Sequence, residues 1–154
     1  MTKGAPGLHC GAAMLRRLVA SLLPALIVLS ACGEVEGSNL APDAVPGSLP
    51  SLVGTYIVNG FDPLGTEYGG HLTITEGEGL NRYHLQWIIT GSIQEGTASV
   101  DGNELVVEWS TVEGLNRDAR GTAEYTVTEA GELYGTRTLV GSDALCTEEA
   151  FPNQ

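Results

Sequence analysis

The chain has 154 residues and is strongly acidic, with 19 aspartates and glutamates against seven lysines and arginines and a net charge of −12. A negative field of this size repels phosphate groups, so the composition argues against nucleic acids and anionic lipid headgroups as partners. It favours cationic partners, or it serves only to keep the protein soluble.

The positive charges gather at the start of the chain. Residues 1–31 contain Lys3, Arg16 and Arg17 and no acidic residue, and an apolar run of 12 residues, 18–29, follows the arginines directly. A helix needs roughly 20 apolar residues to cross a bilayer, so the run is too short for a permanent span. A positive start followed by a short apolar stretch predicts a secretory signal peptide.

The signal ends in Leu29-Ser30-Ala31-Cys32, which resembles the lipobox of bacterial lipoproteins. The resemblance implies cleavage before Cys32, a diacylglyceryl thioether on its sulfur and an acyl chain such as palmitate on the new amine. The lipid would be the partner that holds the protein to a membrane of the bacterial cell envelope. Gly33 is not the aspartate that resembles an inner-membrane retention signal, so we expect the outer membrane, facing the periplasm, in a source with two membranes.

Three segments follow from this interpretation: a signal peptide over 1–31, with Met14 as an alternative start, a lipidated cysteine with a flexible tether over 32–50, and one domain over 51–154. The tether is predicted from its glycine, proline, serine and acidic residues, which show no periodicity. After cleavage, four arginines oppose all 19 acidic residues, which leaves a net charge of −15. Lipid consumes Cys32, so Cys146 has no partner in the chain and a hydrophobic core must hold the domain.

The domain alternates apolar and polar residues with a period of two, which is typical of half-buried strands. Threonine, valine, tyrosine, isoleucine and tryptophan supply the side chains that strands favour. Turn sequences such as Asp101-Gly102-Asn103 and Ala130-Gly131 separate the runs. The expected strands are 53–59, 70–76, 82–90, 93–100, 104–110, 121–128 and 132–140, with a possible eighth near 144–151.

Consecutive strands with short links pair in antiparallel fashion, and seven or eight of them must close or stack to hide their edges. The sequence therefore predicts an all-β domain, a single small antiparallel up-and-down barrel, with a β-sandwich as the alternative. The segment Glu78-Gly79-Leu80-Asn81-Arg82 recurs at 113–117. We interpret the two copies as similar loops, which could share one barrel end and form a contact surface.

Gly54-Thr55-Tyr56 at the first strand and Arg137 on a late strand resemble the signature of calycin-like barrels, the lipocalin and avidin type. In that family Gly-x-Trp opens the first strand, and a late basic residue packs over the indole; here Tyr56 replaces the tryptophan. The resemblance implies a barrel with Arg137 stacked on Tyr56. A buried guanidinium needs an acidic or aromatic partner.

No arrangement typical of catalysis appears in the sequence. His71 and His84 have no motif neighbours, and nothing near Cys146 indicates an activated thiolate. Carboxylates on glycine-rich loops lack the dense alternation of a calcium site. We therefore expect no enzyme, no metal and no cofactor.

Aromatic residues on the expected inward faces are the best candidates for binding: Tyr83, Trp87, Trp109 and Tyr125, together with Arg137. In a filled barrel they form core, and in an open one they line an apolar pocket. The first hypothesis is a non-catalytic binding or scaffolding barrel. The alternatives are a carrier of a small apolar ligand and an acidic inhibitor of a cationic envelope protein such as a lysozyme, the latter by analogy alone.

Overall fold

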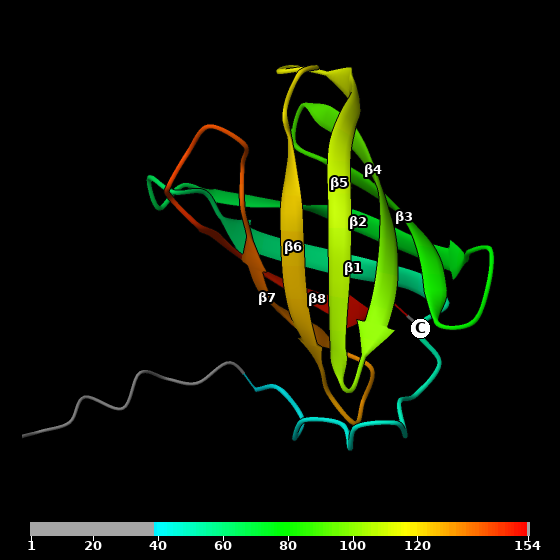
Figure 1. The fold of residues 1–154 in the computed structure, drawn as a ribbon. Helices are drawn as coiled ribbons and strands as arrows, with labels where there is room; N and C mark the ends of the chain where they lie inside the picture. Colours follow the sequence, from blue (N-terminus) through cyan, green and yellow to red (C-terminus); the bar gives the residue numbers. More distant parts are fainter. Residues whose placement is uncertain (1–38, 154) are drawn as a thin grey trace, which may run out of the picture. The chain divides into compact units, whose positions relative to one another are not determined.

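The computed structural model describes residues 39–153, and the predicted signal peptide, Cys32 and the start of the tether lie outside them. The described residues form a closed barrel of eight antiparallel strands in chain order, and they contain no helix (Figure 1). The strands are β1 (Gly54–Phe61), β2 (Glu67–Glu76), β3 (Arg82–Ile89), β4 (Ser92–Asp101), β5 (Glu104–Gly114), β6 (Arg120–Val127), β7 (Leu133–Arg137) and β8 (Cys146–Pro152).

The up-and-down barrel is thus confirmed, and the β-sandwich is wrong because β8 pairs with β1 and leaves no open edge. Along the strands, buried and exposed residues alternate, as in the pattern of β5, where Leu105, Val107 and Trp109 face inward. A register shift between Ile93 and Gln94 places Val112 in a bulge at the end of β5.

The barrel has two distinct ends, which we name by what covers them. The strap end carries the β2–β3, β4–β5 and β6–β7 turns, and the loop end carries the four other connections. A segment that we call the strap, residues 41–52, runs along the first of these ends (Figure 1).

The strap covers residues 41–50 of the expected tether, and this part of the segment packs on the barrel instead of leading freely to it. Ala44 donates its amide to the Val127 carbonyl at 2.9 Å, and Gly47 donates to Gly102 at 3.3 Å. Ala44 is only 2% exposed, and Leu52, two residues before β1, is buried as well. The strap therefore seals one end of the core.

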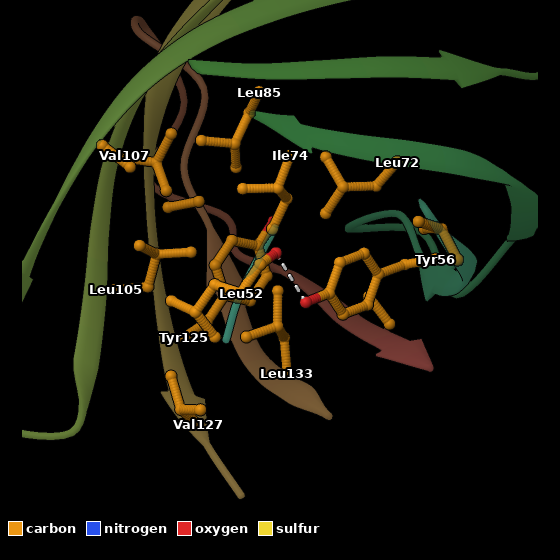
Figure 2. Close-up of a cluster of buried hydrophobic side chains, with 14 of the residues drawn as sticks. Leu52, Tyr56, Leu72, Ile74, Leu85, Leu105, Val107, Tyr125, Val127 and Leu133 are labelled. Atoms are coloured by element: carbon orange, nitrogen blue, oxygen red, sulfur yellow. Dashed lines mark hydrogen bonds between the residues drawn. The ribbon is translucent and has the colours of Figure 1, made fainter. Parts of the chain in front are cut away.

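The apolar part of the core lies next to the strap. Leucine, isoleucine, valine and tyrosine side chains from β1, β2, β3, β5, β6 and β7 converge there on Leu52 of the strap (Figure 2). The Tyr56 hydroxyl donates to the Leu52 carbonyl at 2.8 Å, so the one polar group of this side chain is satisfied inside the core.

Candidate functional site

Between the apolar core and the loop end, the barrel interior is polar. Seven strands each contribute one inward side chain, which together we call the polar layer: Tyr68, Trp87, Gln94, Trp109, Tyr125, Arg137 and Glu148. The remaining strand, β1, contributes Gly60, which faces Tyr68 across the β1–β2 pair. The polar layer is therefore built from the whole circumference of the barrel.

Glu148 is the centre of this layer and is completely buried. Its Oε1 accepts from Trp87 Nε1 at 3.0 Å and from the Tyr125 hydroxyl at 2.6 Å. Its Oε2 accepts from the Tyr68 hydroxyl at 2.8 Å and from Arg137 Nη1 at 2.9 Å. Four donors fill the four acceptor positions of a carboxylate, so the group has no lone pair left to act as a base.

Arg137 is held by stacking as well as by charge. Its guanidinium carbon lies 4.8 Å from the centre of the Trp87 ring and 4.5 Å from that of Trp109, within range of cation–π attraction on both. Nη2 donates to the amide oxygen of Gln94. Arg137 thus has the acidic and the aromatic partners that burial of a guanidinium requires.

The expected stack of Arg137 on Tyr56 does not form. Tyr56 pairs with Pro152 near the strap end, whereas Arg137 pairs with Cys146 at the opposite end of the same strand. The alternation placed Arg137 correctly inside the barrel, but its level within the barrel depends on strand register, which the sequence pattern does not specify.

Burial and charge shift the ionisation of the polar layer. Burial raises the pKa of Tyr125 well above that of a solvated tyrosine, and the negative charge of Glu148 raises it further. Burial and then Glu148 also raise the pKa of Tyr68. For Arg137, burial is the largest single effect and acts to lower the pKa, but Glu148, Tyr125 and Tyr68 together outweigh it and the net shift is upward. The layer therefore keeps Tyr68 and Tyr125 neutral at neutral pH.

The candidate pocket residues do not line one common cavity. Trp87 and Tyr125 are fully buried, and Trp109 is 8% exposed. Trp109 borders a hollow over mostly outward-facing polar side chains of β2–β6, and Tyr83 borders another hollow beside the strap. Trp87, Tyr125 and Arg137 line neither hollow.

Two polar atoms at the loop-end side of the layer are buried without a partner among residues 39–153: Arg137 Nε and the Thr111 hydroxyl.

Glu148 and Gln94 were not singled out from the sequence as site residues. Glu148 carried a usable signal, since it alternates with Cys146 and Ala150 on the inward face of the possible eighth strand. The sequence contains no comparable signal for Gln94, because glutamines are common on outward faces of strands too.

The remaining chemical candidates lie apart from one another. His71 and His84 are exposed on the outer face of the barrel. Cys146 is a free, half-buried thiol whose pKa is raised, mainly by burial. No group of three histidine, cysteine, aspartate or glutamate side chains within residues 39–153 is arranged to hold a metal ion. Within that range no helix is long and apolar enough to cross a membrane.

Exposed apolar side chains are concentrated at the loop end. Of 13 exposed large hydrophobic residues, eight lie there, and we call them the apolar loop surface: Phe61, Leu64, Ile88, Val112, Leu115, Leu139, Val140 and Leu145. Leu64 is 91% exposed and Leu115 is 75% exposed. Such a concentration on one side of a small protein is typical of an interaction site.

The two copies of Glu-Gly-Leu-Asn-Arg have the same backbone conformation but lie at opposite ends. Asn81 and Asn116 have φ values of 55° and 56°, and Gly79 and Gly114 have values of 106° and 105°. The first copy is in the β2–β3 turn at the strap end, and the second leads out of β5 at the loop end. The expectation of one shared surface is therefore wrong, because an odd number of strands separates the two loops.

Comparison with known proteins supports the fold. No protein-family model and no curated protein matches the chain. A redesigned β-barrel, mFAP1, solved bound to DFHBI, is similar at 16% identity over 66% of this chain and 94% of its own, with a TM-score of 0.55. A de novo designed fluorescence-activating β-barrel is similar at 14% identity over 66% and 93%, with a TM-score of 0.54. A further redesigned barrel, b11L5F_LGL, has 14% identity over 67% and 92% and a TM-score of 0.55. At these identities the likeness concerns the fold alone.

Proposed function

We propose that this protein is a lipid-anchored binding protein of the bacterial cell envelope that performs no catalysis and binds its partner through the loop end of the barrel. The observation that carries the proposal is the contrast between a satisfied interior and an apolar loop end. Four donors occupy Glu148 inside the barrel, whereas eight large apolar side chains are exposed at the loops.

The proposal assigns the polar layer to structure and not to chemistry. A general base or nucleophile needs a free lone pair and access to a substrate. Glu148 has neither, because it is fully buried and fully hydrogen-bonded. The designed barrels similar to this one include one described as fluorescence-activating and another, mFAP1, solved bound to DFHBI, so the architecture is compatible with binding.

The membrane anchor is proposed from the lipobox that ends in Cys32. Six residues, 33–38, separate this cysteine from the first described residue, Asn39, and the strap begins two residues later. The nine residue steps from Cys32 to Ala41, where the strap begins, span at most about 30 Å when fully extended. The anchor therefore keeps the strap end near the bilayer and leaves the loop end available to partners.

A second candidate function is the carriage of a small ligand. It is favoured by the buried Arg137 Nε and Thr111 hydroxyl, which have no partner among the described residues and would donate to a ligand oxygen or to a water. A ligand of this kind would meet Trp109 and Gln94, which both contact Arg137 and are each 8% exposed.

Native mass spectrometry of the lipidated protein, extracted gently from its own cells, tests both functions. A protein-sized adduct on the lipidated mass supports the first proposal, and an adduct of a few hundred daltons supports the second. A Cys32→Ala variant, expected to stay out of the membrane fraction and to carry no lipid, is the control for anchoring. A bare, unlipidated mass in the soluble fraction for the natural chain would overturn the anchor, and a bare lipidated mass would overturn both binding functions.

A further inference from the structure

The four connections that carry the apolar loop surface are joined to one another by backbone hydrogen bonds and strand pairs. The Leu115 amide donates to the Gly91 carbonyl at 3.1 Å, which joins the β5–β6 loop to the β3–β4 turn. The Val140 amide donates to the Arg120 carbonyl at 2.8 Å, which joins the β7–β8 loop to β6. Phe61 pairs with Thr147, so β1–β2 and β7–β8 are also neighbours.

Carboxylates are interleaved with these apolar side chains. Asp62 follows Phe61, Glu113 lies between Val112 and Leu115, and Asp143 lies two residues before Leu145. Glu67 and Asp118 add to them, and Arg117 and Arg120 are the basic residues in these connections. The loop end is thus an apolar face inside a field that is negative on balance.

We propose that the apolar loop surface docks a partner protein whose contact face combines apolar side chains with lysine and arginine. This inference rests on the proposed binding function and names its surface and the chemistry of its partner. Apolar contacts supply the affinity, and opposite charges guide the encounter.

The negative charge of the loop end argues against two other partners, a second copy of the chain and an anionic bilayer. A second copy of the chain would bring one negative face against another, with Asp62, Glu113 and Asp143 on both sides, and like charges across an interface cost binding energy. An anionic bilayer would meet the same repulsion. The six residues between Cys32 and Asn39 also tie the opposite end of the barrel to the proposed anchor.

The repeated pentapeptide offers a matched pair of positions for a test. Leu80 and Leu115 occupy the same place in Glu-Gly-Leu-Asn-Arg, in the same backbone conformation, and both are largely exposed, at 94% and 75%. They differ in the end of the barrel that carries them. A photo-crosslinking residue placed at 115 or at 80 of the full lipidated chain therefore compares the two ends under equal local conditions.

We expect the probe at 115 to form an adduct with one protein in intact cells and the probe at 80 to form none with it. That protein is then identified from the adduct and purified. Its affinity for the lipidated chain is expected to fall at least tenfold in Leu115→Ser and to stay within twofold in Leu80→Ser. Raising the salt concentration from 50 to 300 mM is expected to slow association severalfold, as a basic partner requires.

Both variants are expected to keep the unfolding midpoint of the natural chain, because both leucines are on the surface. The docking inference is overturned if the adduct at 115 is a second copy or lipid, if affinity is the same in both variants, or if salt has no effect. An adduct at 80 alone overturns the surface but preserves the binding function. Adducts at neither position, together with a bare lipidated mass, overturn both.

Discussion

Arg137 and Glu148 form an ion pair inside the barrel, with 2.9 Å between Arg137 Nη1 and Glu148 Oε2 and both side chains almost completely buried. Removing two charges from water costs several kcal/mol per ion, which their attraction offsets only when the other donors and acceptors are also satisfied. Glu148 meets this condition through Tyr68, Trp87 and Tyr125. The pair therefore depends on the complete polar layer.

Replacing Glu148 by glutamine is expected to destabilise the fold by about 3–5 kcal/mol, because Arg137 loses its counter-charge while it stays buried. The amide also brings a donor to a position that already faces four donors. Urea unfolding followed by tryptophan fluorescence measures the change. Glu149→Gln is the control: Glu149 is the next residue and faces outward, so a loss below about 0.5 kcal/mol is expected. Equal losses in the two variants would contradict the role given to the pair.

Alkaline pH is expected to destabilise the protein. Burial raises the pKa of Tyr56 to about 12 and raises those of Tyr68 and Tyr125 as well. In the unfolded chain these groups release their protons near pH 10, so above that pH the folded state binds more protons than the unfolded state. Stability is then lost as pH rises, by up to about 1.4 kcal/mol per pH unit for each tyrosine that stays protonated.

Urea midpoints between pH 8 and pH 11.5 measure this loss. Tyrosinate absorbance provides an independent check, since at least three fewer tyrosines should titrate near pH 10 in the native protein than in guanidinium. A midpoint that stays constant from pH 9 to pH 11.5, with all five tyrosines titrating together in the native protein, would show that the hydroxyls reach solvent.

Gly60→Ala is expected to destabilise the barrel by about 2 kcal/mol through overpacking. A methyl group at this position would lie 2.6 Å from the Tyr68 hydroxyl oxygen and 2.8 Å from the Thr147 carbonyl oxygen. Tyr68 would have to move away from Glu148. Gly69→Ala is a suitable control, because its nearest neighbour would be 3.3 Å away, and it should cost clearly less in the same thermal unfolding assay.

The packing of the strap predicts that aspartate substitutions at two adjacent residues, Ala44 and Val45, differ in their effect on stability. Ala44→Asp is expected to cost about 3 kcal/mol, because Ala44 is 2% exposed and an aspartate there would be buried without a partner. Val45→Asp should be nearly neutral, since Val45 is 61% exposed. Chemical unfolding of the two variants checks this, and similar stabilities would mean that residues 41–50 are a loose tether after all.

Period-two alternation was enough to predict the barrel and to place most strands within a few residues. It also put Trp87, Trp109, Tyr125 and Arg137 on inward faces, which their burial agrees with. Alternation reports which side of a strand a residue faces, and that is a local property.

Which inward residues meet could not be predicted in this way. Arg137 was matched with Tyr56 by resemblance, although Glu148 satisfies it, because the level of each residue in the barrel is set by register. The strap was missed for a related reason. The strap residues that pack in the core, Ala44, Leu49 and Leu52, are spaced irregularly, and their burial depends on the end of a barrel that forms only after folding.

The pairing of β1 with β8 has a consequence for the order of folding. Glu148 belongs to the last strand of the barrel, whereas its four hydrogen-bond donors lie on earlier strands. During synthesis the acceptor therefore becomes available only after all four donors. Until it arrives, the chain is at most an open curled sheet with two unpaired edges and an arginine lacking its counter-ion. Closure is a contact of long sequence separation, which makes folding slow relative to local hairpin formation. If the chain is exported, as the proposed signal peptide requires, it would accordingly remain receptive to chaperones until residues 146–152 have left the export channel.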